Sequence, residues 1–389
     1  MRDARNYPEA LQFLGKTYAN ALMRLDPDIN GFAEVPDSAS CWAPITSTIS
    51  QLPYLTIRSE EKADRITKGK IIGNIKMGGK YSIIDDVITD GMSKIDAYNV
   101  MKANDVNILP LIVLVDRQQG WRKKFSELGI DLKVWSGMTL HHVRKYLIEK
   151  GLMIRCDKSV EEKNPIIIAL DGKSWYDILP IIDELRTTGC ILKVNDLAFN
   201  KGIETIVPNL SVYGRVMLDL KGHDIENTWK NIANLLRDNP PWAVTVHASG
   251  SKNMVKAVVD KLADTNVKVL AVTVLTSIDG ETCQEIYNRQ PLEQVLLLAK
   301  IARDAGAHGI VCSPEEVAEV RKICPNMTLI TPGIRYGEKI ENDDQKRIAT
   351  PKVARENGAN YLVIGRQILT ATDPVEEVTR LLKEELKVA

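Results

Sequence analysis

Two charged residues follow one apolar run of this sequence at a spacing that brings their side chains together. In VMLDLKGHDIENT, residues 216–228, Asp219 and Lys221 are two positions apart, so in a β-strand both side chains point to the same face. Leu218 and Leu220 then face the opposite side. An isolated Asp-x-Lys is also the pattern of a surface ion pair, which contributes little to stability.

Two more charged residues close the preceding apolar runs. Asp171 ends PIIIALD, and Lys193 lies near the end of CILKV. Burying two acids and two lysines together is costly unless they pair and hydrogen-bond with one another, so such a cluster is more often a functional site than scaffold. A lysine fixed between acids stays protonated and can deliver its proton. If the strands are neighbours, the four residues therefore indicate a functional site.

The runs that carry these residues belong to a regular series. Short apolar, β-branched runs alternate with amphipathic stretches of helical period, such as PLEQVLLLAKIARDAG, over about 225 residues. The runs are 165–171, 190–194, 215–221, 242–248, 268–275, 308–312, 327–333 and 360–365. Eight strands alternating with helices predict an α/β fold, a (β/α)8 TIM barrel, whose active site lies at the carboxyl ends of the strands. We therefore expect the four charged residues to converge at one rim.

The N-terminal part of the chain, residues 1–154, follows a different plan. A helix-like start, NYPEALQFLGKTYANALMRL, precedes strand candidates near PYLTIR, KYSIIDDVI, ILPLIVLVDR and DLKVW. This pattern predicts a smaller open α/β sheet. A polar segment, RCDKSVEEKNP, predicts a linker over 155–164, with the barrel occupying 165–389.

The composition excludes several classes of function. Lys plus Arg and Asp plus Glu both total 51, so there is no basic excess that would favour nucleic acid or a membrane surface. The six cysteines are scattered without a CxxC pair, and the five histidines do not cluster, so we expect reduced thiols and no structural zinc. The N-terminus has no apolar signal region, and a cytoplasmic protein is expected.

The charged motif also carries a resemblance to a known family. LDLKGHDIENT resembles the signature of orotidine 5′-phosphate decarboxylase, Asp-x-Lys-x-x-Asp-Ile-x-Asn-Thr. IALD, LKV, VTVHASG, LAVTVLTS, GIVCS, ITPGIR and YLVIGR agree with that family in order, and the resemblance covers about residues 165–385. It implies decarboxylation of orotidine 5′-phosphate to UMP in pyrimidine biosynthesis, by a homodimer with shared active sites and without a cofactor or metal in the barrel.

The resemblance implies a role for each matching residue. Lys221 would donate the proton that traps the C6 carbanion left when carbon dioxide departs, and Asp219 would lie against the substrate carboxylate. Lys193 would hold the charge network and reach the ribose. Asp224 and Thr228 would cross a dimer interface to the neighbouring subunit's site. The remaining substrate contacts would be Asp171 to the ribose hydroxyls, Ser277 to the pyrimidine amide edge, and Gly365 with Arg366 to the phosphate.

The chain departs from the family in one loop, and a sister group offers an alternative. In the family a glutamine-bearing loop after the seventh strand closes over the phosphate, whereas here no Gln follows directly on residues 334–336, and Gln345 lies further on. The sister group of magnesium-dependent sugar-phosphate synthases and decarboxylases shares Asp-x-Lys-x-x-Asp. HDIENT, VLTS and TPGIR favour the orotidine 5′-phosphate decarboxylases.

The N-terminal part resembles a second family. YSIIDDVITDGMSK, residues 81–94, is similar to the phosphoribosyl-pyrophosphate motif of type I phosphoribosyltransferases, and PYLTIRSEEK and VLVDRQQGW are similar to segments of orotate phosphoribosyltransferase. The order of the two domains is that of bifunctional UMP synthases. The implied contacts to phosphoribosyl pyrophosphate, orotate and Mg²⁺ are Arg58, Lys62, Asp85, Asp86, Thr89, Gly91 and Arg117.

This second resemblance is less complete than the first. Ser59 and Asp64 stand where the mobile loop of the family has a lysine and a histidine or tyrosine. Losing a cation that should meet the departing pyrophosphate would remove transition-state stabilisation. The alternative is therefore a catalytically inactive domain that binds phosphoribosyl ligands or supports oligomerisation.

Overall fold

The computed structural model of the chain describes residues 4, 6–35, 39–58, 70–153, 155–336 and 347–388. The chain divides into two compact units, Met1–Leu147 and Ile148–Ala389. Within the described residues, no helix is long and apolar enough to cross a membrane.

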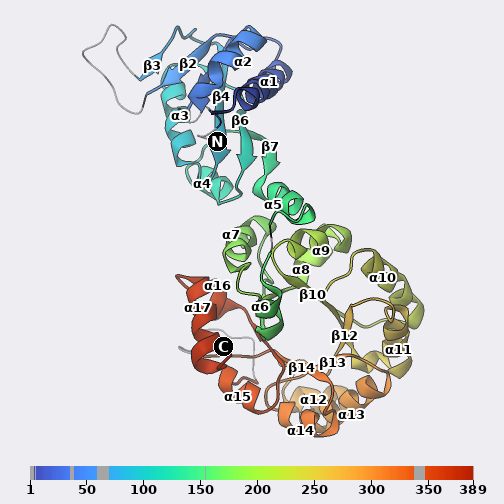
Figure 1. The fold of residues 1–389 in the computed structure, drawn as a ribbon. Coiled ribbons are helices and arrows are strands. Elements are labelled where there is room, and N and C mark those ends of the chain that lie inside the picture. The colour runs from blue at the N-terminus through green and yellow to red at the C-terminus, as the bar shows by residue number, and fades with distance from the viewer. Residues whose placement is uncertain are drawn as a thin grey trace. The chain divides into compact units, whose positions relative to one another are not determined.

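The second unit contains a closed barrel of eight parallel strands (Figure 1). Neighbouring strands follow one another in the chain, and the last strand pairs with the first. The strands are β8 (Ile166–Ala169), β9 (Ile191–Val194), β10 (Arg215–Gly222), β11 (Ala243–His247), β12 (Lys268–Val272), β13 (Gly309–Val311), β14 (Thr328–Thr331) and β15 (Tyr361–Ile364). Each coincides with one of the eight apolar runs, so the predicted barrel is confirmed.

Helices follow the strands and surround the barrel (Figure 1). They are α7 (Trp175–Leu185), α8 (Asp196–Lys201), α9 (Ile203–Ser211), α10 (Glu226–Asp238), α11 (Lys252–Lys261), α12 (Gly280–Tyr287), α13 (Pro291–Asp304), α14 (Val317–Ile323), α15 (Pro351–Glu356), α16 (Arg366–Leu369) and α17 (Pro374–Arg380). Local sequence sets their starts: a capping box at α7 pairs Ser174 with Asp177, and Asp279 and Asp373 cap α12 and α17.

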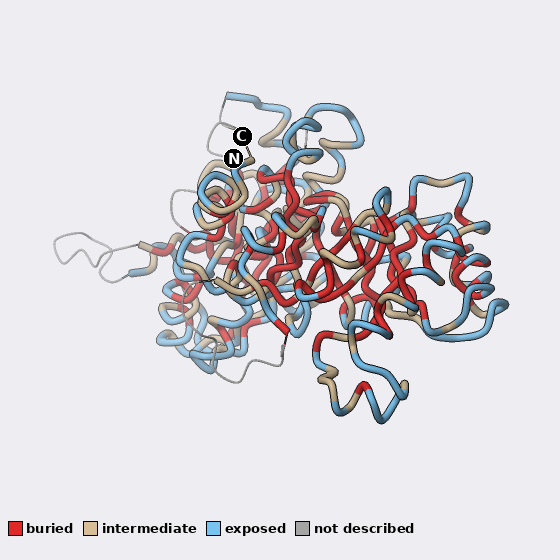
Figure 2. The backbone as a smooth tube through the Cα atoms, turned by 90° about the horizontal axis from the view of Figure 1, so that it is seen from below, coloured by how far each residue is buried: buried red, intermediate tan, exposed pale blue. Residues whose placement is uncertain are grey.

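The period-2 alternation of the strands builds two cores. Inward residues fill the barrel and include Ile191 of β9 and Met217 of β10. Outward residues such as Leu192 and Leu218 pack beneath the helices. The buried residues, red in Figure 2, lie in the interior, and the exposed residues, pale blue, lie mainly on the outer turns and loops. Above the inward apolar layer, the next inward positions of the same strands are free to carry polar side chains.

The polar segment 155–164, predicted as a linker, contains a short helix. This helix, α6 (Lys158–Lys163), begins at Asp157, whose carboxylate accepts a hydrogen bond from the Ser159 amide at 2.8 Å. Arg155 donates to Glu161 at 2.7 Å and to the Ser211 carbonyl at 2.8 Å. The segment therefore belongs to the second unit. Its polar composition reflects a single capped turn with no buried face.

The first unit is an open sheet with helices on both faces. The strand order is β3-β2-β1-β4-β6-β7, with β5 beside β4, and all pairs are parallel except β2 with β3. The strands are β1 (Gly31–Glu34), β2 (Tyr54–Ile57), β3 (Ile71–Ile72), β4 (Lys80–Ile88), β5 (Asn107–Ile108), β6 (Leu111–Asp116) and β7 (Val134–Thr139). The helices are α1 (Pro8–Leu25), α2 (Ala43–Ser50), α3 (Met92–Lys102), α4 (Trp121–Glu127) and α5 (Leu140–Glu149), and the boundary between the two units falls within α5.

Each face of this open sheet has its own core. Phe32 and Ile84 pack with α1 and α2 on one face, while Ile83 and Val113 pack with α3 and α4 on the other. The predicted open α/β sheet is therefore observed. The sequence pattern did not predict β1, because GFAE is too short to show a period. The parallel strands bring the carboxyl ends of β1, β2, β4 and β6 to one edge of the sheet.

Candidate active site

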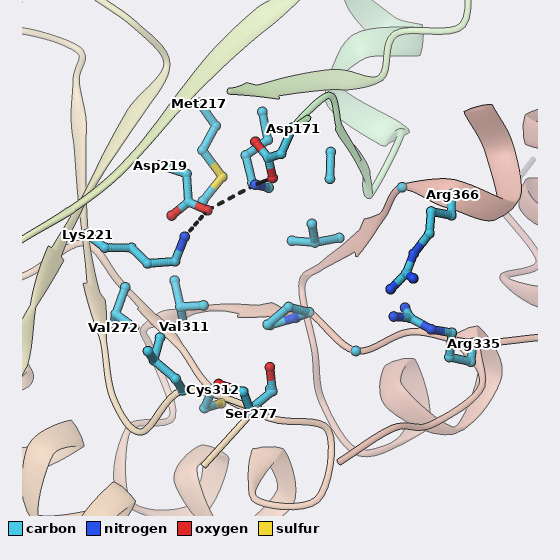
Figure 3. A pocket seen from close by; sticks show the side chains of 18 of the residues that line it. Asp171, Met217, Asp219, Lys221, Val272, Ser277, Val311, Cys312, Arg335 and Arg366 are labelled. Carbon is cyan, nitrogen blue, oxygen red and sulfur yellow. Dashed lines mark hydrogen bonds and ion pairs between the residues drawn. The ribbon is translucent and has the colours of Figure 1, made fainter. Parts of the chain in front are cut away.

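The four charged residues predicted to converge do so at the carboxyl ends of β8, β9 and β10. The Lys193 ammonium bonds to Asp171 Oδ2 and lies 3.0 Å from Asp219 Oδ2. The Lys221 ammonium lies 2.6 Å from the same Asp219 oxygen (Figure 3). Asp219 is thus the shared anion between two lysines.

The strands place these side chains one layer above the barrel core. Met217 of β10 pairs in register with Lys193 of β9, and Asp219 is the next inward residue of its strand. The β10 strand then bulges, and Lys221 has a positive φ of 46°. The side chains of Lys193 and Asp219 are buried. Those of Lys221 and Asp171 reach the cavity, and 36% and 40% of their respective surfaces are exposed.

The electrostatics of the cluster keep its two buried groups, Lys193 and Asp219, charged. Burial alone would raise the pKa of Asp219, but the adjacent charges of Lys193 and Lys221 and their hydrogen bonds lower that pKa to about 2. Burial opposes the charged form of Lys193 as well, yet Asp219 and Asp171 raise its pKa above the ordinary lysine value. The site therefore holds ionised lysine and aspartate side by side at neutral pH.

A cavity of about 680 Å³ opens beside this cluster. Its apolar wall includes Met217, Val272 and Val311. Arg335 and Arg366 extend into the side opposite Asp219 and Lys221 (Figure 3). A ligand with a reacting group at one end and an anionic group at the other matches this distribution of charge.

Most residues predicted for this site line the cavity. Asp171, Lys193, Asp219, Lys221, Ser277, Gly365 and Arg366 all do so. Lys173 and Arg335 also line it and were not among the predicted site residues. Arg335 follows the seventh strand in TPGIR, so its position at a strand end could have identified it.

Asp224 and Thr228 do not line the cavity of their own chain within the described residues. Asp224 is exposed on the loop after β10 and accepts a hydrogen bond from the Ile225 amide at 2.6 Å. Thr228 lies in the first turn of α10. Gln345, in the loop after β14, lies outside the described residues.

The first unit gathers its predicted residues at the carboxyl edge of its sheet. Arg58 follows β2, Asp85 and Asp86 lie in the last part of β4, and Arg117 follows β6. Thr89 and Gly91 form the turn before α3. Gly91 has φ 86°, and a Cβ there would lie 2.6 Å from the Phe125 ring, so only glycine fits. Lys62 lies outside the described residues.

Asp85 is already engaged within its own unit. Its Oδ2 lies 2.5 Å from the Lys94 ammonium, and both side chains are buried. Burial raises the pKa of Asp85 to about 6, against the opposing effect of Lys94. Asp86 is half-buried and more accessible. In the described part of the chain, no group of three His, Cys, Asp or Glu side chains is placed to hold a metal ion.

Comparison with known proteins matches the second unit to a family. The model of the orotidine 5′-phosphate decarboxylase / HUMPS family matches residues 164–381, more than half of the 389 residues. Orotidine 5′-phosphate decarboxylase of Neisseria meningitidis serogroup A is 38% identical over 229 residues, covering 57% of this chain and 93% of that protein. The enzyme of the same name from Laribacter hongkongensis is 37% identical over 222 residues, covering 56% and 91%.

A solved structure agrees with these relatives. The crystal structure of orotidine 5′-phosphate decarboxylase from Lactobacillus acidophilus is 35% identical, with a TM-score of 0.51, and the match covers 57% of this chain and 98% of that one. The chain belongs to the orotidine 5′-phosphate decarboxylase / HUMPS family.

Proposed function

We propose that the second unit converts orotidine 5′-phosphate to UMP and carbon dioxide. The observation that carries this proposal is the position of Lys221, whose ammonium is held 2.6 Å from the buried Asp219 carboxylate beside the cavity. Membership of the family makes the chain an enzyme, and the relatives are named for this decarboxylation, which needs no cofactor.

The charge network suits the chemistry of this reaction. Loss of carbon dioxide breaks the C6–carboxylate bond and leaves the electron pair on C6, as a vinyl carbanion that the ring cannot delocalise. A fixed ammonium beside C6 stabilises that charge as it develops. Lys221 then gives its proton to C6 and is reprotonated from solvent. Asp219, ionised beside the substrate carboxylate, repels the bound substrate more than the neutral carbon dioxide that departs.

The rest of the cavity would bind the nucleotide away from the reacting carbon. Arg366 and Gly365, with Arg335 beside them, would hold the phosphate, and Ser277 would meet the pyrimidine amide edge. Asp171, with Lys193 behind it, would bind the ribose hydroxyls. Binding energy from the remote phosphate can then position C6 against Lys221.

The direct test is release of carbon dioxide from orotidine 5′-phosphate by the full chain, with and without EDTA. We expect stoichiometric UMP and carbon dioxide, and turnover that EDTA leaves unchanged. Turnover that requires added Mg²⁺, or turnover only with a sugar phosphate, would instead support the sister group.

We also propose that two copies of the chain share their active sites. Asp224 and Thr228 are not among the described residues that line the cavity of their own chain. They would instead contact the substrate in the active site of a second copy. Ile225, between them, has 68% of its surface exposed, so this loop is open to contact with a second copy.

For the first unit, we propose binding of phosphoribosyl pyrophosphate and orotate, and formation of orotidine 5′-phosphate on the same chain. What supports this is the collection of Arg58, Asp86, the Thr89–Gly91 turn and Arg117 at one sheet edge. Turn amides of this kind bind phosphate. Mg²⁺ would arrive with the pyrophosphate and neutralise its charge, since Mg²⁺ sites of this kind use one or two carboxylates plus substrate phosphates.

The alternative for the first unit is an inactive ligand-binding or oligomerisation module. Incubating the full chain with orotate, phosphoribosyl pyrophosphate and Mg²⁺ separates the two. The transferase would be established if UMP forms and Asp86→Asn abolishes its formation. The control is Asp96→Asn, at an exposed position of α3, which should leave UMP formation unchanged. Binding of phosphoribosyl pyrophosphate without product would establish the inactive module.

A further inference from the structure

One buried hydroxyl contacts both halves of the Asp219–Lys221 pair. Thr245, the middle residue of β11, is fully buried and points into the barrel. Its Oγ1 lies 3.0 Å from Asp219 Oδ1 and 2.9 Å from the backbone nitrogen of Lys221. Thr245 is not among the described residues that line the cavity, so any effect on a bound ligand passes through its two partners.

The directions of these two hydrogen bonds are fixed by the partners. The Lys221 amide can only donate, so the hydroxyl oxygen accepts from it. An ionised carboxylate can only accept, so the single hydroxyl hydrogen goes to Asp219. The Thr245 hydroxyl therefore accepts one hydrogen bond from the Lys221 amide and donates its only hydrogen to Asp219.

The backbone around Lys221 explains why such a contact is needed. Leu218 pairs with Val244, but Gly222 pairs with Val246, so four positions of β10 are accommodated opposite two positions of β11. Thr245 is the residue of β11 that faces this bulge. Lys221 lies in the bulge at φ 46°, a left-handed conformation that a lysine adopts only when its surroundings hold it there.

We propose that Thr245 is a positioning residue for the decarboxylation: its hydroxyl holds the bulged backbone of Lys221 and orients the Asp219 carboxylate toward the Lys221 ammonium. Asp219 receives Lys193 and Lys221 on Oδ2, while Thr245 occupies Oδ1. The carboxylate is thereby fixed from both sides. This inference rests on the function proposed above for Asp219 and Lys221.

The test compares Thr245→Val, which keeps the shape and removes the hydroxyl, with Thr245→Ser, which keeps the hydroxyl. We expect Thr245→Val to lower kcat by a factor on the order of 10 to 100, because the proton donor is displaced while the phosphate site is untouched. KM and the Kd for UMP should stay within about threefold, and Thr245→Ser should recover most of kcat.

Thr273→Val is the matched control. Thr273 is also buried, and its hydroxyl donates to the Val311 carbonyl at 2.9 Å rather than to any of the four charged residues. A general loss of packing or hydrogen bonding would affect both valine variants alike, whereas positioning predicts a loss of kcat at Thr245 alone. If Thr245→Val does not fold, Thr245→Cys keeps the volume with a weaker donor and should show a smaller loss of the same kind.

A crystal structure of Thr245→Val gives a readout that does not depend on activity. We expect Lys221 to leave φ near 46° or its ammonium to move away from Asp219 Oδ2. An unchanged Lys221 and Asp219 in that structure, or an unchanged kcat in an active enzyme, would overturn the inference. A wild-type enzyme that releases no carbon dioxide would overturn the proposed function instead, and the crystal structure would still decide the role of Thr245.

Discussion

At the scale of single residues, Asp219 is the group on which both lysines depend. Its carboxylate is buried and accepts from Lys193, Lys221 and Thr245. Burial raises the pKa of Asp219, but the two lysines outweigh this effect and lower that pKa to about 2. A lowered pKa means that the folded protein binds the proton less well than the unfolded chain, so the ionised form stabilises the fold.

The pH dependence of stability follows from that shift. The contribution of Asp219, about 2 kcal/mol, is fully present above the unfolded pKa near 4 and is lost as pH falls toward 2. We expect the difference in unfolding free energy between wild type and Asp219→Asn to shrink over this window, measured by urea unfolding at each pH. A difference that stays constant from pH 5 to pH 2 would show that Asp219 is not held ionised by its partners.

Gly222 is a second residue whose identity the site requires. It directly follows Lys221, and a Cβ at this position would lie 2.7 Å from Cε2 of the buried Trp229. We expect Gly222→Ala to lower the unfolding free energy by about 1 to 3 kcal/mol and to reduce kcat by displacing Lys221. Gly280→Ala is the control, because the nearest atom to a Cβ there is 3.4 Å away. Equal stability of the two variants would contradict this account.

At the scale of elements, a buried ion pair links three loops of the barrel rim. Arg347, after β14, pairs with Glu316, before α14, and donates to the Leu275 carbonyl, after β12, at 2.9 Å. Both charged side chains are buried. Burial is the dominant influence on Glu316 and raises its pKa despite the nearby Arg347. Ser277 lies on one of the three linked loops, so the ion pair supports part of the cavity wall.

Removing one partner of this pair should therefore be costly. We expect Arg347→Met to lower the unfolding free energy by about 3 to 5 kcal/mol, because Glu316 is left charged and buried. Replacing Glu316 by Gln as well should recover part of the loss. Lys256→Met, which removes an exposed pair with Asp260, should change stability by less than about 1 kcal/mol. Similar losses for the two single variants in urea unfolding would contradict the assignment.

Some of these elements are predictable from the sequence and others are not. The eight barrel strands and the inward position of Asp219 follow from period-2 alternation, because burial on the barrel's inner and outer faces leaves a clear pattern. The bulge at Lys221 does not, because it depends on the hydroxyl of Thr245 in the next strand. Helix α6 was missed because its residues 158–163 bury no side chain and so show no amphipathic period.

At the scale of the whole molecule, the proposed sharing of Asp224 between subunits can be tested by mixing inactive variants. Each proposed site takes Lys221 from its own chain and Asp224 from the other chain. In a dimer of one Lys221→Ala chain and one Asp224→Asn chain, one of the two sites therefore keeps both residues. Co-refolded mixed dimers should regain one intact site each, about a quarter of all sites in a random mixture. Mass spectrometry should confirm that the mixture contains mixed dimers. If such a mixture remains inactive, the proposed sharing of sites is wrong.

The two units of the chain differ in how directly their chemistry follows from their structure. In the second unit, the charged residues meet at 2.6 to 3.0 Å beside a cavity, and the known relatives cover the same residues. In the first unit, Asp85 is already paired with Lys94, so a phosphoribosyl ligand that contacts Asp85 must share it with Lys94 or displace Lys94. The conversion of orotate to UMP by the full chain examines both units in one assay.

The proposed decarboxylation depends on the proton that Lys221 gives to C6, so the decisive experiment removes this ammonium group. Carbon dioxide release from orotidine 5′-phosphate should be measured for wild type and Lys221→Ala, with UMP binding as the check that the cavity is intact. We expect UMP to bind within about tenfold of wild type and kcat to fall by a factor on the order of 10³ or more. Turnover by Lys221→Ala within about tenfold of wild type would contradict the account.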